Sequence, residues 1–322
     1  MISAPELILD AQADLGEGPA WNQRSGWLTW VDIRRGHLHI YDPLDRSDRH
    51  VELGQAIGCA APRRSGGMVL GLRSGFALTP GPSPEGRGEQ KIEGPRPLLD
   101  PAPSPEGRGE WNITRPRPFL NPEPHLPGNR FNDGKCDPAG RFLAGSMDDA
   151  EIAATGSLYS LQADGSLKTL VTGTRISNGL TWSPDYHTFY FIDTPTRMVM
   201  AYDYDLASGD IAAPRQAVNV PPELGWPDGM TSDTEGMLWV AMWGGAKLTR
   251  WNPATGGLLA EIPFPALNVS ACAFGGPGLT DLYVTSARKG MDADQLAKYP
   301  LSGGLFRIRT DIQGLPTFEY GG

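Results

Sequence analysis

In three separated segments of the chain, an oxygen-bearing side chain stands directly before a glycine. The segments are Glu17-Gly18, Asn178-Gly179 and Asp228-Gly229, and each is followed by β-forming residues. Two carboxylates and one amide oxygen are ligands that suit a hard divalent cation such as calcium, magnesium or manganese. A single Asp-Gly or Asn-Gly pair is common turn chemistry, but the shared register of three segments favours one metal site.

A second set of polar residues could bind a small ligand. Arg130 and Asn132 precede a fourth acidic pair, Asp133-Gly134. A guanidinium and an amide hold hydroxyl or carbonyl oxygens through directional hydrogen bonds, although an arginine paired with a surface carboxylate beside an Asn-Asp turn would look the same. Asp149 follows the expected strand 142–147, where its carboxylate could bind a hydroxyl or lie in a solvated turn.

The five histidines offer little for catalysis. We expect His37 and His39 to share one strand face, and the other three, including His50, to lie in loops or turns. None falls in the register of the metal-ligand segments, and no Gly-x-Ser-x-Gly sequence is present. A Ser-His-Asp mechanism therefore has little support.

These residues must be positioned by strands, because short β-branched and aromatic segments alternate with turn signals. Examples are 27–32, 188–193 and 237–241, and the 41 glycines and 30 prolines disfavour helices. Similar units recur at a period of about 40 to 50 residues, which is typical of a propeller. Innermost strands line a propeller's channel, so equivalent positions converge there. Six units predict a single all-β domain, registered at Glu17, Ala56, Asp133, Asn178, Asp228 and Val269.

One interval between units is too long, and a duplication accounts for it. The octapeptide Pro-Ser-Pro-Glu-Gly-Arg-Gly-Glu occurs at 82–89 and again at 103–110. We therefore expect a Pro/Gly-rich duplicated insertion at about 82–123 in blade two. Such a composition buries little apolar surface, so the insertion should be mobile or extended and should not carry the chemistry.

Charge and composition exclude several classes of protein. The net charge of −9 would repel phosphate backbones, so no nucleic-acid partner is expected. The three cysteines have no paired spacing and should be reduced and buried. No leader pattern opens the chain, and no run approaches the roughly 18 apolar residues that span a bilayer. We expect a cytoplasmic protein without a membrane partner, monomeric or weakly homo-oligomeric.

Several segments together resemble the gluconolactonase and regucalcin family, also called the senescence marker protein family of sugar-lactone hydrolases. The matching pieces include 15–21, 129–135, 177–185, 227–230 and 285–290. They follow the order of the family and span nearly the whole chain. The resemblance implies a six-bladed β-propeller with a central metal site. The Pro/Gly-rich duplication departs from the family pattern.

The resemblance also implies the roles of the site residues. One divalent ion, calcium, zinc, manganese or magnesium, would be held by Glu17, Asn178 and Asp228, with Asp228 also acting as the catalytic acid/base. Arg130 and Asn132 would contact the substrate. A further acid of the family has no clean counterpart, and Asp149 is the nearest residue to carry that role.

These features lead us to expect metal-dependent hydrolysis of a sugar lactone, an aldonolactone, to the aldonic acid. Two alternatives stay open. A regucalcin-like calcium-binding or regulatory propeller would use the same ligands to stabilise the fold. A metal-dependent esterase or organophosphate hydrolase of related form is disfavoured by the lack of histidine in the inner register.

Overall fold

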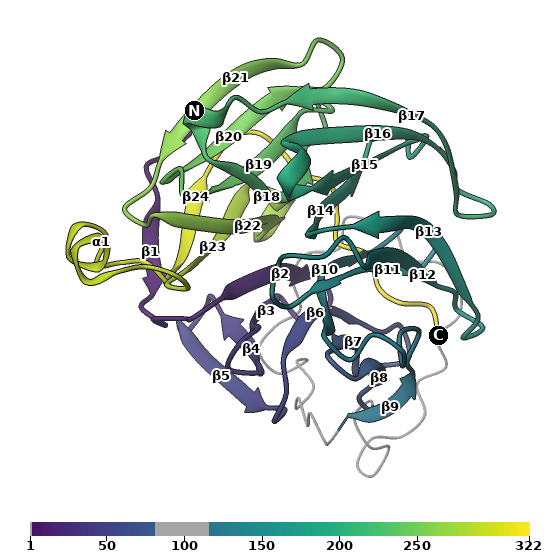
Figure 1. Ribbon diagram of the computed structural model, residues 1–322. Coiled ribbons are helices and arrows are strands. Elements are labelled where there is room, and N and C mark those ends of the chain that lie inside the picture. Colours follow the sequence, from purple (N-terminus) through teal and green to yellow (C-terminus); the bar gives the residue numbers. More distant parts are fainter. Residues whose placement is uncertain (1, 81–115) are drawn as a thin grey trace.

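Six four-stranded antiparallel sheets surround a central channel as the blades of a propeller (Figure 1). The structure is a computed structural model that describes residues 2–80 and 116–322. It confirms the predicted all-β, six-bladed architecture. No helix within these two ranges is long and apolar enough to cross a membrane.

Each blade begins with its innermost strand, which neighbouring blades crowd on both sides. A Cβ added at Gly58 would lie 2.3 Å from the backbone of Phe131, and one at Gly179 would lie 2.6 Å from the carbonyl oxygen of Asp228. Glycine is needed at these positions because only it allows the inner strands to approach so closely. The inner strands are β2 (Gly16–Asn22), β6 (Ile57–Pro62), β10 (Asn129–Cys136), β14 (Ser177–Trp182), β18 (Trp226–Ser232) and β22 (Asn268–Gly275).

In four of the blades, the inner strand interrupts its pairing with the second strand for two residues. A β-bulge of this kind bends the strand and re-aims its side chains. Asn178 and Asp228 are each the first residue of their bulge, and Glu17 directly precedes the bulge of blade one. The blade-three counterpart of Asn178 and Asp228 is Asn132, so the registers expected for Asp133 and for Glu17 are each wrong by one residue, in opposite directions. The bulges are Gly18-Pro19, Asn132-Asp133, Asn178-Gly179 and Asp228-Gly229.

The second and third strands of each blade carry most of the apolar core. The second strands are β3 (Trp27–Asp32), β7 (Met68–Leu72), β11 (Phe142–Asp148), β15 (Thr188–Asp193), β19 (Leu238–Trp243) and β23 (Asp281–Ala287). The third strands are β4 (His37–Asp42), β8 (Gly75–Leu78), β12 (Gly156–Leu161), β16 (Met198–Asp205), β20 (Lys247–Asn252) and β24 (Leu305–Arg309).

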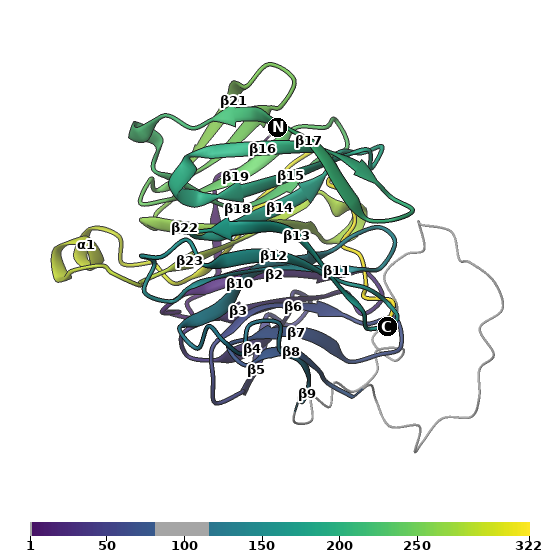
Figure 2. The same ribbon diagram turned by 45° about the vertical axis from the view of Figure 1, so that its right-hand side comes forward.

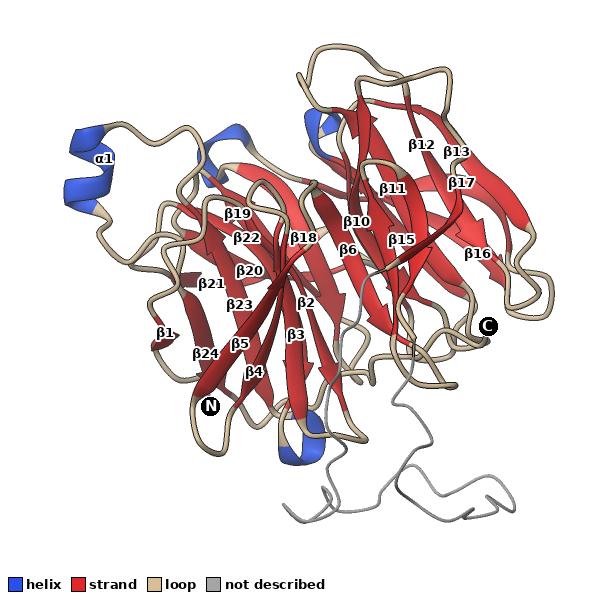
Figure 3. Cartoon of the chain, turned by 90° about the horizontal axis from the view of Figure 1, so that it is seen from below, coloured by secondary structure: helices blue, strands red, loops and turns tan. Residues whose placement is uncertain are grey.

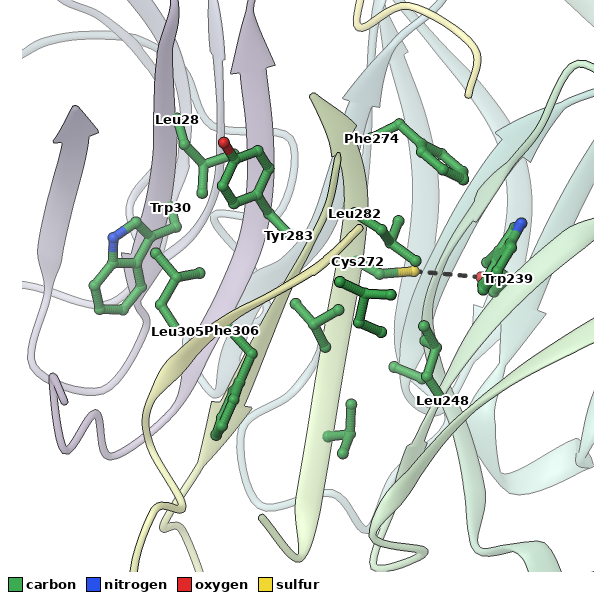
Figure 4. Packing of buried hydrophobic residues seen from close by; sticks show 14 of the residues in the cluster. Leu28, Trp30, Trp239, Leu248, Cys272, Phe274, Leu282, Tyr283, Leu305 and Phe306 are labelled. Atoms are coloured by element: carbon green, nitrogen blue, oxygen red, sulfur yellow. Dashed lines mark hydrogen bonds between the residues drawn. The ribbon is translucent and has the colours of Figure 1, made fainter. Parts of the chain in front are cut away.

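Side chains of facing blades fill the space between the sheets. Figure 4 shows the cluster that joins blades one, six and five, in which Trp30, Tyr283 and Trp239 are all fully buried. The Sγ of Cys272 donates a hydrogen bond to the carbonyl oxygen of Trp239 at 3.4 Å. All three cysteines are buried and free, as predicted.

The outermost strands complete the blades, and the ring is closed by the N-terminal segment. Strand β1 pairs with β24, so blade six contains residues from both ends of the chain. Figure 2 shows the sheets stacked side by side from another direction. The outer strands are β1 (Glu6–Leu9), β5 (Ser47–Glu52), β9 (Arg117–Leu120), β13 (Leu167–Thr174), β17 (Asp210–Asn219) and β21 (Gly257–Pro263).

Most of the predicted insertion, residues 82–115, lies outside the described residues. Its last part belongs to the fold, because β9 pairs with β8 as the fourth strand of blade two. Glu123 is buried, and its Oε1 accepts hydrogen bonds from Ser146 Oγ at 2.6 Å and Tyr159 OH at 2.9 Å. The end of the second repeat therefore joins blade two to blade three.

Helices are few in the part of the chain that the structure describes, and all are short (Figure 3). Helix α1 (Ala293–Lys298) follows a capping box, in which Asp292 Oδ1 accepts from the backbone N–H of Gln295 at 2.8 Å. The 3₁₀ turns are η2 (Thr194–Thr196), η3 (Pro222–Leu224) and η4 (Pro277–Leu279).

Candidate metal and ligand site

A cavity of about 690 Å³ opens at one end of the channel. Glu17, Arg130, Asn132, Asn178 and Asp228 all line it, although they come from four different inner strands. Asn132, Asn178 and Asp228 are bulge residues, and Glu17 and Arg130 lie one and two residues before a bulge, so all five come from the part of the inner strands that faces the axis. Five of the six residues proposed from the sequence therefore share one cavity.

Two of the carboxylates at this cavity are buried and repel each other. Glu17 is 5% exposed and Asp228 is 4% exposed. Burial, followed by the nearby charges of Asp228 and Asp133, raises the pKa of Glu17 well above its usual range. Burial and then Asp133 likewise raise the pKa of Asp228, which a hydrogen bond with the Asn178 side chain opposes. A cation at this place would relieve the repulsion.

The side chain of Asn178 is held by its amide nitrogen. Nδ2 donates to Thr194 Oγ1 at 3.0 Å, and Thr194 Oγ1 donates to the carbonyl oxygen of Pro227 at 2.8 Å. The Oδ1 of Asn178 is buried and accepts no hydrogen bond from any described residue. An unpartnered buried oxygen beside two carboxylates is a donor set that fits a hard divalent cation.

Arg130 is held rigidly at the cavity wall. It is buried, and its Nη1 donates to Asn132 Oδ1 at 2.7 Å and to the carbonyl oxygen of Phe131 at 3.0 Å. Asn132 Nδ2 in turn donates to the carbonyl oxygen of Ser177 at 2.9 Å. Since the amide of Asn132 is engaged on both sides, it orients Arg130. The Nη2 of Arg130 makes no hydrogen bond within the described chain and is available to a ligand oxygen.

Asp149 is not among the described residues that line the cavity. Its Oδ1 accepts from Arg130 Nε at 2.7 Å, and it also forms an ion pair with Arg73. The acid of this segment at the cavity is Glu151, which forms an ion pair with Lys289. The sequence did not predict Glu151 at the cavity, because the chain turns there with a φ of 63°. Non-glycine residues rarely adopt this conformation, so the residue type does not indicate it.

An aromatic side chain at the cavity was also missed. Trp226 lines the cavity and is 41% exposed, with the guanidinium of Arg197 at 3.6 Å from its ring centre. By contrast, Trp21, Trp182 and Trp239 are buried packing residues. Trp226 therefore places a partly exposed aromatic ring at the cavity, with Arg197 stacked on it.

The fold and the cavity define a six-bladed propeller with an acidic, oxygen-rich channel mouth, and comparisons place it in a family. Residues 15–288 match the sequence model of the SMP-30/Gluconolactonase/LRE-like region. The chain is 34% identical over 320 residues to regucalcin of Danio rerio, with 98% of each chain covered. It is 33% identical over 316 residues, again with 98% of each chain covered, to YvrE of Bacillus subtilis (strain 168), a protein provisionally named a sugar lactone lactonase.

A solved structure is similar over almost the same length. It is a calcium-binding protein, regucalcin, from Agrobacterium tumefaciens, with a TM-score of 0.84, 24% identity, and coverage of 99% of this chain and 97% of the other. At that identity the likeness supports the propeller fold alone. The chain belongs to the SMP-30/gluconolactonase family, which confirms the resemblance seen in the sequence.

Proposed function

We propose that the protein hydrolyses a sugar lactone with one divalent cation held by Glu17, Asn178 and Asp228. The observation that carries this proposal is the meeting of two buried carboxylates, an unpartnered amide oxygen and a guanidinium in one cavity. Membership of a family that includes proteins named as lactonases supports the same reaction class.

The donor set of the site is made entirely of oxygen atoms. Calcium, magnesium and manganese prefer such ligands, and zinc also accepts carboxylates although it is more often bound by nitrogen and sulfur. When bound, a divalent cation polarises an ester carbonyl and makes water more acidic. Zinc is thus the least favoured of the four ions considered.

Asp228 is the residue best placed to move a proton. Its carboxylate lines the cavity together with Glu17 and Asn178, beside the place where the cation and the attacking water would lie. Asp228 would accept a proton from the attacking water while the oxygen of that water bonds to the lactone carbonyl carbon. The bond from that carbon to the ring oxygen then breaks, and Asp228 returns the proton to this oxygen, giving the aldonic acid.

Arg130 and Asn132 would hold the sugar in place for this reaction. Arg130 presents Nη2 to a hydroxyl or carbonyl oxygen, while Asn132 fixes the guanidinium. Asp149 would contribute by holding Nε of Arg130. We extend substrate contact to Glu151 and Trp226, because both line the cavity.

A pH-indicator assay over hexonolactones and pentonolactones tests the function. The chelated protein should be inactive, and single additions of calcium, magnesium, manganese or zinc should restore turnover to different extents. Asp228→Asn should lower kcat by about 10²-fold or more, as loss of a general base does. If no lactone is hydrolysed with any of these ions, the protein is not a sugar lactonase.

A calcium-binding role without catalysis is the second candidate, since several relatives are named regucalcin and the Agrobacterium protein is described as calcium-binding. In that role the ion stabilises the fold. Chelation would then lower the melting temperature, while no lactone would be turned over in the presence of calcium.

A further inference from the structure

The two outer strands of blade one carry three histidines and two acids on one face. Antiparallel pairing of β4 with β5 sets His37 opposite Glu52 and His39 opposite His50. Because strand side chains alternate between faces, these four and Asp48 point to the same side of the sheet. His50 lies within β5, so its predicted place in a loop is wrong. The two strands lie on the outside of the propeller, and none of the five residues lines the cavity (Figure 1).

The three imidazoles lie close enough to share one ion. Their ring centres are separated by 4.6 Å for His37 and His50, 5.1 Å for His39 and His50, and 5.8 Å for His37 and His39. Two imidazoles on one tetrahedral ion hold their ring centres roughly 5 Å apart, because each metal–nitrogen bond is about 2.0–2.1 Å long. The ligand atoms of these residues fall into two overlapping groups that share His50, namely His37, His50 and Glu52, and His39, Asp48 and His50, and within each group the atoms lie within 4.8 Å of one another.

His39 is oriented in the way that metal-binding histidines are. Its Nδ1 lies 2.7 Å from Asp48 Oδ2, and Asp48 Oδ1 accepts from Trp30 Nε1 at 3.2 Å. The Trp30 ring also stacks on His39 at 3.8 Å between centres. A carboxylate on Nδ1 keeps the proton there and leaves the lone pair of Nε2 for a metal.

The remaining groups favour capture of an ion from solvent. His50 and Glu52 are exposed, so an ion reaches them directly, while His39 is buried beneath them. His37 is half-buried between the exposed pair and His39. Glu52 Oε1 lies 3.9 Å from His37 Nε2, a spacing that a bridging ion would span.

We propose that this face binds a transition-metal dication such as Zn²⁺. His37, His39, His50 and Glu52 are the ligands, and Asp48 is the positioning residue for His39. Four protein ligands make a closed site, which is typical of structural zinc and ties the outer strand β5 to β4. The imidazole-rich donors distinguish the site from the all-oxygen set in the channel, and the proposal does not depend on the proposed function.

Zinc titration of the chelated full-length protein by isothermal calorimetry tests the proposal. The Glu17→Gln background weakens the channel site, so that binding at blade one is measured on its own. His50→Gln should abolish one equivalent of zinc and the zinc-dependent rise in melting temperature. His187→Gln is the matched control, because His187 is also exposed and lies 3.8 Å from a carboxylate, Asp185, on a different blade.

Two further measurements keep the proposal falsifiable. Asp48→Asn should weaken zinc binding by about 10–100-fold without removing a ligand, as loss of an orienting carboxylate does. Cobalt in place of zinc should give the intense visible absorption of a tetrahedral nitrogen-ligated ion, lost in His37→Gln. Equal zinc stoichiometry and affinity in the background protein, His37→Gln and His50→Gln would overturn the site, provided that circular dichroism shows all three proteins folded.

Discussion

At the scale of single residues, three carboxylates that are almost fully buried lie close together along the channel. Glu17, Asp228 and Asp133 are all buried, and burial is the largest cause of the raised pKa of each. A folded-state pKa above the unfolded value means that ionisation opposes folding. The arrangement is therefore costly in the metal-free protein at neutral pH, and a divalent cation offsets that cost.

Glu17→Gln should stabilise the metal-free protein at neutral pH. The carboxyl contributes stability in full below its unfolded pKa, and this stability is lost as the pH rises toward the raised folded pKa. Glutamine has no carboxyl group that ionises, so the variant keeps this stability as the pH rises. Its melting temperature at pH 7 should exceed that of the wild type by about 2–4 °C. Thermal melts in chelator from pH 4 to 8 measure the difference. Wild-type and variant curves that stay parallel over this range would contradict the argument.

The contacts of Arg130 predict an order of effects on activity. Arg130→Gln should lower kcat/KM by about 10–100-fold, the size of a lost charge-assisted hydrogen bond. Asp149→Asn should cost less, because Asp149 holds the guanidinium but is not among the described residues that line the cavity. Arg73→Gln, which removes only the outer partner of Asp149, should cost least. Steady-state kinetics on one lactone give the ranking, and an Asp149→Asn loss as large as that of Arg130→Gln would indicate direct substrate contact.

At the scale of strands, the inner β-bulges convert a sequence repeat into a site. They require close packing of backbone on backbone, which Gly179 permits. Gly179→Ala should destabilise the protein by about 1–3 kcal/mol, because the new methyl group would meet the backbone of Asp228 and Met230. Gly128→Ala is the control, since the nearest atom to its added Cβ is 3.7 Å away. Denaturant midpoints should fall for Gly179→Ala and stay nearly constant for the control.

Structural features that repeat along the sequence could be predicted, whereas features that do not repeat could not. The blades and the convergence of Asn178 with Asp228 follow from repetition, so they could be predicted. The sequence does not reveal where each bulge begins, which is why Asn132 and not Asp133 matches Asn178 and Asp228, and why Glu17 lies one residue earlier than they do. Glu151 reaches the cavity through a turn with positive φ, and His50 pairs in a polar strand without an alternating apolar pattern.

The duplicated segment contains a strand that its sequence did not predict. Composition predicted an insertion up to residue 123, because the repeat extends that far. The strand β9 inside it has only four residues and includes Pro118, so it carries little strand signal. Its place in blade two depends on tertiary pairing with Phe76 and Ala77.

At the scale of the whole molecule, the proposed channel ligands come from blades one, four and five, whereas the unpaired residues on the inner strands of blades two and six are Gly58 and Ser270, which are not proposed as ligands. A cation bound to Glu17, Asn178 and Asp228 would therefore link the first blade to the fourth and fifth across the axis. The other blades are held by side-chain packing and by the pairing of β1 with β24.

Calcium binding should accordingly stabilise the propeller unevenly. We expect amide hydrogen exchange to slow most in β2, β14 and β18, and least in β6 and β22, because the proposed ligands lie on the first three strands. Exchange measured by mass spectrometry with calcium and with chelator gives the comparison. Asn178→Ala removes the neutral ligand and should abolish the difference while leaving both carboxylates in place. Uniform slowing across all six inner strands would mean that the ion stabilises the fold globally and does not link the three blades through these side chains.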